Sequence, residues 1–314
     1  MLISVCLIAF VAAWLGCAAI VHLAPKFSFL DAPGDRSSHS RPTPTSGGVA
    51  IILAVTIAVL VGEIDVSPTL AIAAWVLGIT GFVDDRTPVS ARAKLLIQFA
   101  MVGLLMANSV EGNAGFWLLM LTLSIPVVGM INMFNFMDGI DGMAAQQAIF
   151  MLLLFGLFNV GGDGSNYLLA AAIAGFALWN APPARLFMGD SGSLPLGLVL
   201  ASPLIMTQNA AAGPIVLIAW SLFVIDAGVT LLDRVRRNQP LMQAHKDHVY
   251  QRLSRRLGAH RPVTLLYLGI NIGWCLPLAM AAQQWPTLAW WLVAIAWGGL
   301  GVAAAYALNR LASD

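Results

Sequence analysis

The sequence predicts an all-α membrane protein, a polytopic bundle of about 11 transmembrane helices that forms a single domain. Composition is the first indication, because 59% of the 314 residues are hydrophobic and 10% are charged, whereas soluble domains carry roughly 25% charged residues. The second is a series of long apolar runs, which must cross lipid as helices because backbone groups cannot stay unpaired there. The third is that the cations gather in alternate connections between these runs, as the positive-inside rule requires.

The first predicted span begins at the N-terminus. Residues 1–24 contain no acid, lysine or arginine, and they exceed the ~18–20 residues that cross a bilayer. A signal peptide is the alternative, but no cation precedes Lys26 and no small-residue cleavage site precedes a soluble domain, so we expect a retained helix. The eleven predicted spans lie near residues 3–23, 47–62, 68–83, 93–109, 115–132, 143–160, 166–181, 191–208, 213–233, 262–281 and 286–308.

The cations then predict the orientation of these spans. When the connections are numbered in chain order, all 16 lysines and arginines fall in odd-numbered connections, at their edges or at the C-terminus. The only charged residues in the even-numbered connections are four acids, Glu63, Asp65, Glu111 and Asp163. This separation predicts a periplasmic N-terminus and a cytoplasmic C-terminus. The odd-numbered connections also hold nearly every reactive polar residue, so we expect the functional site on the cytoplasmic face.

The first connection places His39 and Arg41 among prolines and ends on Gly47 and Gly48. Proline fixes φ, and glycine permits close approach of the backbone. A stiff connector and a substrate-binding loop both account for this composition, and the residues alone leave the two open.

Adjacent carboxylates, Asp84 and Asp85, end the third span. They repel each other unless a metal, a cation or a shared proton relieves them, and acids at a helix C-terminus oppose the helix dipole. A solvated helix end paired with Arg86 is the alternative. Lys94 opens the next span, where an interface anchor is one interpretation of a lone cation.

The segment after the fifth span contains the strongest motif. Asn132, Asn135 and Asp138 are spaced three apart and share one face if they are helical. The run Asp138-Gly-Ile-Asp141-Gly142 then ends the helix and supplies oxygen donors, which suit Mg²⁺. The ligand spacing of an EF-hand is absent, and a plain turn would not need so many amide and carboxylate groups.

Two further acids lie near or within later spans. Asp190 stands among Gly189, Ser191 and Gly192 at the start of the eighth span, where backbone N–H groups can bind an anion and the acid can bind a metal. A glycine-rich helix cap is the alternative. Asp226 lies inside the apolar ninth span, so we expect it to face the bundle interior as a functional-site candidate.

The long connection after the ninth span combines imidazoles and cations, His245, His248 and Arg252 among them. Zinc is disfavoured because no third nitrogen or sulfur ligand is near. Charge-assisted hydrogen bonds to a diphosphate suit this set, and contact with anionic lipid heads is the alternative.

These motifs, in this order from Asp31 to about Leu253, resemble the polyprenyl-phosphate N-acetylhexosamine-1-phosphate transferases. That family includes the phospho-MurNAc-pentapeptide translocase and the enzymes that initiate O-antigen lipids. The resemblance implies a bacterial inner-membrane enzyme with a cytoplasmic active site. Its expected substrates are a UDP-N-acetyl amino sugar and undecaprenyl phosphate in the membrane lipid, its products UMP and a lipid-diphospho-sugar, and its cofactor Mg²⁺, with Mn²⁺ as a substitute.

The resemblance also implies residue roles. The paired acids lie near the lipid phosphate, Phe187 stacks on the uracil ring, and the histidine-rich connection faces the diphosphate and sugar. The expected site residues are Asp84, Asp85, Lys94, His245 and His248 as catalytic groups, Asn132, Asp138, Asp141, Phe187, Arg252, His39 and Arg41 as substrate-binding groups, and Asn135 and Asp190 as metal ligands.

Two departures refine this expectation. Arg86 follows the paired acids where some members have a third acid nearby, and His245-Lys-Asp-His248 replaces three consecutive histidines. The second departure favours the O-antigen-initiating branch over a MurNAc-pentapeptide donor and leaves GlcNAc, FucNAc and QuiNAc open. An ionised lipid phosphate is already a nucleophile, which favours direct displacement over an aspartyl intermediate, with Asp85 orienting or deprotonating the acceptor.

Other functional classes fit the sequence less well. A transporter would carry internal repeats and polar groups at the bilayer midplane, whereas the acids here cluster in connections on one side. A CDP-alcohol phosphotransferase would have Ala-Arg soon after Asp138-Gly139, where this chain has Ile-Asp-Gly. A scaffold would leave the four polar clusters unexplained, and no basic stripe indicates nucleic acid. Trp285, Trp290, Trp291 and Trp297 suit a membrane-interface belt, with a homodimer face as the alternative.

Overall fold

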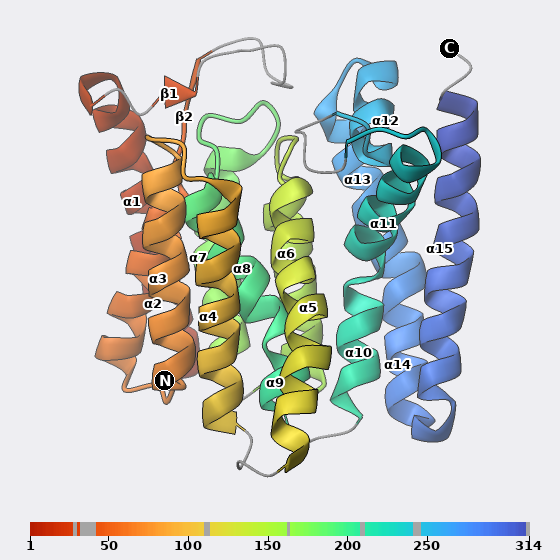
Figure 1. Ribbon diagram of the computed structural model, residues 1–314. Coiled ribbons are helices and arrows are strands. Elements are labelled where there is room, and N and C mark those ends of the chain that lie inside the picture. The colour runs from red at the N-terminus through yellow and green to blue at the C-terminus, as the bar shows by residue number, and fades with distance from the viewer. Residues whose placement is uncertain are drawn as a thin grey trace.

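The computed structural model describes residues 1–27, 30–31, 42–109, 114–161, 164–207, 211–240 and 246–311. Within these residues almost all regular structure is helical (Figure 1), which confirms the predicted all-α class. The helices are α1 (Leu2–Phe27), α2 (Gly48–Gly62), α3 (Pro68–Asp84), α4 (Ala91–Ser109), α5 (Ala114–Phe136), α6 (Met143–Leu157), α7 (Ser165–Asn180), α8 (Asp190–Ala201), α9 (Pro203–Met206), α10 (Ala212–Ala219), α11 (Ser221–Arg236), α12 (Val249–Leu257), α13 (His260–Ile270), η1 (Asn271–Cys275), α14 (Leu276–Gln284), η2 (Pro286–Leu288) and α15 (Ala289–Leu311). Two short strands, β1 (Leu30–Asp31) and β2 (Thr43–Pro44), pair antiparallel with Leu30 opposite Pro44.

Helix length decides which segments could span a bilayer by themselves. Four segments of the described chain are long and apolar enough, Leu2–Ala24, Ala91–Asn108, His260–Gln284 and Pro286–Leu311. The bent pair α10 and α11 makes a fifth if it counts as one span. Other apolar helices are shorter, among them α2, α3 and α6 with 15–17 residues each, and at 1.5 Å per residue these three reach at most about 26 Å. The protein is therefore a multi-pass membrane protein, while the number of 11 spans stays a prediction.

The predicted spans differ from the helices where a helix breaks. The predicted span 213–233 is two helices that meet at Trp220 at an angle of 60°. The predicted span 191–208 is divided into α8 and α9 at Ser202. Both segments are mainly apolar, and the hydropathy of a segment does not reveal a change of helix direction.

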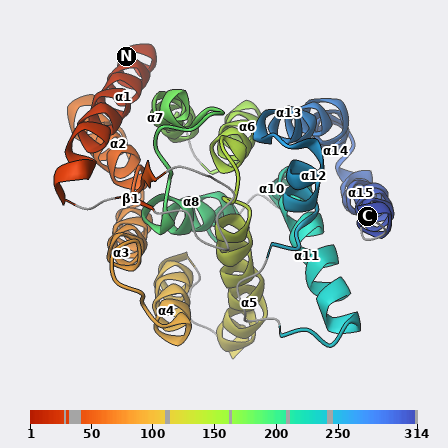
Figure 2. The same cartoon turned by 90° about the horizontal axis from the view of Figure 1, so that it is seen from above.

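Helix α8 lies near the middle of the bundle and contacts α2, α3, α5 and α6 (Figure 2). Almost all of its residues are buried, as expected for a helix that is apolar on every side. Glycines allow its first turn to touch two neighbours. A Cβ on Gly81 of α3 would lie 2.1 Å from the Asp190 carbonyl oxygen, and one on Gly48 of α2 would lie 2.1 Å from the Gly192 nitrogen. The packing thus fixes Asp190 beside the ends of α2 and α3.

The motif-bearing helix ends lie at one end of the bundle. The C-terminal ends of α3, α5 and α11, the start of α8, and α12 are at the upper end in Figure 1. Helix α1 begins at the lower end and α15 finishes at the upper end. The chain thus starts and finishes at opposite ends of the bundle, as an odd number of crossings requires.

Candidate active site

Lys94 links the paired acids to the start of α8. Its Nζ lies 2.7 Å from Asp84 Oδ2 and 3.1 Å from Asp190 Oδ2. Asp84 also accepts a hydrogen bond from the backbone N–H of Val89, at 2.7 Å. Residues from α3, α4 and α8 that are far apart in sequence therefore meet at one point, and Lys94 does more than anchor a helix at the membrane interface.

Asp85 points to a different set of partners. Its carboxylate accepts hydrogen bonds from Ser46 Oγ at 2.8 Å, from Asp190 N at 2.8 Å and from Ser191 N at 3.4 Å. Burial raises the pKa of Asp85, and these hydrogen bonds oppose that shift. An acid in this position satisfies the free N–H groups at the start of α8. Gly189 approaches so closely that a Cβ there would lie 2.4 Å from Asp85 Oδ2. Ser46 was missed by sequence reasoning, because nothing in its spacing relates it to Asp85.

The two side-chain amides of α5, Asn132 and Asn135, have different partners. Asn135 Nδ2 donates to Asp190 Oδ1 at 2.7 Å and to Ser193 Oγ at 2.8 Å. Asn132 instead donates to Gln98 Oε1 on α4 at 2.7 Å and to the Val128 carbonyl at 2.8 Å. The structure therefore brings Asn135 to the carboxylates and does not bring Asn132 there, because Gln98 lies within its reach.

Asp138 and Asp141 follow the end of α5. Burial raises the pKa of Asp138 well above its ordinary value, and the charges of Asp190, Asp85 and Asp141 raise it further. Asp141 accepts a hydrogen bond from Ala184 N at 3.0 Å, and its Oδ1 lies 3.1 Å from His260 Nδ1. The neighbouring acids thus disfavour the ionised form of Asp138. Asp141, in contrast, connects the turn to α13 through His260.

Phe187 enters the site through its backbone. Its N–H donates to the Pro44 carbonyl at 2.8 Å, and its carbonyl accepts from Gly47 N at 2.9 Å. These bonds hold the segment before α8 against the segment before α2. The side chain of Phe187 is half-buried, and its expected contact with uracil stays a prediction.

The segment around α12 packs against α11. Asp226 is 3% exposed, which confirms that it faces the interior, and its carboxylate accepts hydrogen bonds from Val249 N at 2.9 Å and Tyr250 N at 3.0 Å. His248 is also 3% exposed, with Nδ1 3.4 Å from Asp226 Oδ1. Arg252 donates to the Asp247 carbonyl at 2.8 Å. Three other predicted site residues, His39, Arg41 and His245, lie outside the described residues.

The donor chemistry of the cluster suits a magnesium ion. In the described part of the chain, no three His, Cys, Asp or Glu side chains are already grouped as a metal centre. Asp190 and Asn135 are nevertheless joined by a hydrogen bond, and the charge of Asp85 acts on Asp190 as well. Mg²⁺ takes one or two protein carboxylates and fills its remaining positions with water and substrate phosphates. Asp190 and Asn135 therefore fit as the protein's share of such a site.

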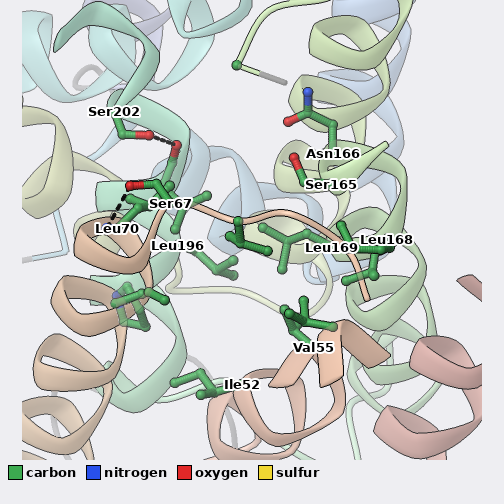
Figure 3. A pocket seen from close by; sticks show the side chains of 18 of the residues that line it. Ile52, Val55, Ser67, Leu70, Ser165, Asn166, Leu168, Leu169, Leu196 and Ser202 are labelled. Carbon is green, nitrogen blue, oxygen red and sulfur yellow. Dashed lines mark hydrogen bonds between the residues drawn. The ribbon is translucent and has the colours of Figure 1, made fainter. Parts of the chain in front are cut away.

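A cavity of about 680 Å³ lies between α2, α3, α7, α8 and α9 (Figure 3), and its lining extends from Gly48 and Gly192, at the starts of α2 and α8, to Asp65 and Thr207. Its walls are mainly apolar, with Ser67, Ser165, Asn166 and Ser202 among the polar residues. None of the described site residues lines it. The reactive groups are thus at the end of the bundle and not in this cavity.

Comparison with known proteins agrees with the motifs. Residues 67–208, which contain most of the described cluster, match the glycosyl transferase family 4 model. A decaprenyl-phosphate N-acetylglucosaminephosphotransferase of Mycolicibacterium smegmatis is 30% identical to this chain in a match that covers 80% of this chain and 75% of that relative. An undecaprenyl-phosphate alpha-N-acetylglucosaminyl 1-phosphate transferase of Thermotoga maritima is 30% identical over 248 residues, which cover 77% and 79%.

A phospho-N-acetylmuramoyl-pentapeptide-transferase of Deinococcus radiodurans is 28% identical in a match that covers 76% of this chain and 87% of the relative. Similar proteins thus include both polyprenyl-phosphate N-acetylglucosamine-1-phosphate transferases and a phospho-N-acetylmuramoyl-pentapeptide-transferase. The chain belongs to glycosyl transferase family 4, the membrane transferases that comprise the polyprenyl-phosphate N-acetylhexosamine-1-phosphate transferases and the phospho-MurNAc-pentapeptide transferases.

Proposed function

We propose that this protein transfers N-acetylhexosamine-1-phosphate from a UDP-linked amino sugar to undecaprenyl phosphate. The observation that carries the proposal is the joining of Asp84, Lys94, Asn135 and Asp190 at one end of the bundle, in a chain whose relatives are named for this reaction with undecaprenyl or decaprenyl phosphate. The product, a lipid-diphospho-sugar, would initiate O-antigen or another surface polysaccharide.

The reaction exchanges one phosphorus–oxygen bond for another. An oxygen of the lipid phosphate attacks the β-phosphorus of the UDP-sugar, the bond from that phosphorus to the bridging oxygen breaks, and UMP leaves with the bond's electrons. Such transfers depend mainly on positioning and on neutralising phosphate charge. Lys94 supplies a cation between two acids, and Asp85 holds the start of α8 in place. We assign Asp190 and Asn135 to hold Mg²⁺, which when bound neutralises phosphate oxygens.

The orientation and substrate preference belong to the same proposal. The protein would cross the bacterial inner membrane 11 times, with the N-terminus in the periplasm and the active site in the cytoplasm, because all cations lie in alternate connections. The absence of three consecutive histidines favours a UDP-N-acetylhexosamine over UDP-MurNAc-pentapeptide as the donor.

Release of UMP tests the reaction. Purified protein in detergent would be mixed with undecaprenyl phosphate and, in turn, UDP-GlcNAc, UDP-FucNAc, UDP-QuiNAc and UDP-MurNAc-pentapeptide. We expect release that needs both substrates and that stops when a chelator removes divalent metal. Asp190→Asn should reduce the rate of UMP release at least about 100-fold. The control Asp65→Asn should leave this rate unchanged, because Asp65 is exposed in the connection between α2 and α3, at the opposite end of the bundle.

Other outcomes would redirect the proposal. Release only from UDP-MurNAc-pentapeptide would overturn the donor and keep the reaction. A phosphorylated enzyme formed without lipid acceptor would replace direct displacement by a covalent intermediate. No release from any donor, by protein that remains folded, would overturn the reaction itself.

A further inference from the structure

The buried carboxylate of Asp226 lies outside the acid cluster and has no part in the steps proposed above. It is one of the few acids within the apolar helices of the described chain, and it is 3% exposed. An acid in such a place is costly unless its charge is balanced by hydrogen bonds. Its partners therefore indicate what it is for.

Those partners come from two other helices. Oδ1 accepts from Val249 N at 2.9 Å, and Oδ2 accepts from Tyr250 N at 3.0 Å. The hydroxyl of Tyr267 on α13 donates to Oδ2, and Nδ1 of His248 lies 3.4 Å from Oδ1. The carboxylate thus satisfies the free N–H groups at the start of α12 and lies at the positive end of its dipole.

Helix α12 continues this contact toward the acid cluster. The ring of Tyr250 stacks on His248 with centroids 5.8 Å apart, and its hydroxyl donates to the Phe136 carbonyl at 2.8 Å. A Cβ on Gly139 would lie 2.1 Å from that hydroxyl. Phe136 is next to Asn135, and Gly139 is next to Asp138. The anchored helix therefore touches the turn that carries the cluster's amide and acid.

The position of His248 fits the same arrangement. The residue is 3% exposed, and its ring is close to those of Phe136 and Tyr250. A carboxylate beside one ring nitrogen orients the imidazole, a role that supporting acids take around many sites. An imidazole enclosed in this way is placed to support α12 rather than to meet solvent.

We propose that Asp226 is a positioning residue that, together with His248, anchors the start of α12 against the Asn135–Gly139 turn and so aligns the transfer site. The inference rests on the proposed function. Asp226 touches no reacting atom in this scheme. Its effect reaches the substrates through α12, which also carries Arg252.

Four variants test the anchor through the rate of UMP release and through amide hydrogen exchange: Asp226→Asn, His248→Ala, their double variant and Tyr267→Phe. We expect Asp226→Asn to lower kcat for UMP release about 10-fold to 100-fold, with KM for the UDP-sugar changed less than about threefold. The amides of Val249 and Tyr250 should exchange hydrogen faster than in the wild type. Because His248 acts through the same contact, the double variant Asp226→Asn/His248→Ala should lose little more kcat than the worse single variant. Tyr267→Phe, which keeps the carboxylate and removes one donor, should lower kcat in the same direction and provides a milder test if Asp226→Asn does not fold.

Thr230→Val is the matched control. Thr230 lies one turn further along α11, is fully buried, and its hydroxyl has no hydrogen-bond partner among the described residues. The near-isosteric change should leave kcat and exchange as in the wild type. Losses of kcat that multiply in the double variant, a loss of thermal stability alone, or unchanged exchange at Val249 and Tyr250 would each overturn the anchor. If the wild type releases no UMP the proposed function fails, while the exchange measurement still decides whether Asp226 holds α12.

Discussion

At the scale of single residues, the cluster carries more negative charge than its own cation balances. Asp84 and Asp190 share Lys94, and Asp85 is held by hydrogen bonds at the start of α8. Asp138 has a raised pKa because burial and neighbouring acids disfavour its anion. In the proposed reaction this site receives the diphosphate of the UDP-sugar and the lipid phosphate, so it needs further positive charge, which a divalent cation would bring.

The raised pKa of Asp138 predicts how stability depends on pH. The unfolded chain releases the proton of Asp138 near the ordinary pKa of Asp, about 4, whereas the folded protein keeps this proton up to its raised pKa. Between these two pKa values the free energy of unfolding therefore falls as pH rises. Asp138→Asn removes this titration. We therefore expect the variant to unfold at a higher apparent temperature than the wild type at about pH 7, with a flatter dependence on pH.

Thermal unfolding in detergent at several pH values measures both quantities. Asp65→Asn is the matched control, because Asp65 is exposed at the other end of the bundle, and it should keep the wild-type dependence. A steeper fall with pH in Asp138→Asn than in the wild type would show that the carboxylate is stabilised as an anion.

At the scale of helices, the sequence predicts the position of a polar residue along a helix better than it predicts the partners of its side chain. The span expected at 68–83 is α3 (Pro68–Asp84), so Asp84 and Asp85 fall at its end as predicted. Apolar run length sets such boundaries. The partner of Asn132 is Gln98, and that of Asp141 is His260, 119 residues later. No spacing rule relates residues so distant, because packing alone brings them together.

The contact between α3 and α8 makes a test at the same scale. In Gly81→Ala the new Cβ would lie 2.1 Å from the Asp190 carbonyl oxygen, and a backbone atom cannot turn aside as a side chain can. The helices must separate, which moves Asp84 from Asp190. We expect UMP release to fall about 100-fold, the effect of displacing reactive groups by about 1 Å.

Gly129→Ala on α5 is the control, because a Cβ there meets nothing within 4 Å. Alanine favours a helix over glycine by about 0.5–1 kcal/mol, so this variant should keep the wild-type rate and unfold at the same or a higher temperature. If Gly81→Ala kept the wild-type rate, the close contact of α3 with α8 would not be needed for activity.

At the scale of the whole molecule, charge along the chain and the arrangement of helices make one prediction together. The described cations lie mainly near the end of the bundle that carries the acid cluster, and α1 begins at the other end (Figure 1). Hydropathy alone would not establish this, since several apolar helices have only 10–17 residues. The cations add the orientation, because positive loops stay in the cytoplasm.

Labelling of single cysteines tests that orientation. Arg255 is exposed on α12 at the cluster end, and Asp65 is exposed between α2 and α3 at the other end. The native cysteines are buried or half-buried within α1 and η1, so the unsubstituted protein measures the background. In spheroplasts, a membrane-impermeant maleimide should label the Asp65→Cys variant, and it should label the Arg255→Cys variant only after the membrane is opened.

Labelling in the reverse order would place the acid cluster in the periplasm, where no UDP-sugar is supplied, and would exclude the proposed reaction. Labelling of both variants from outside would place the two positions on the same side of the membrane. This result would contradict the predicted odd number of crossings between them.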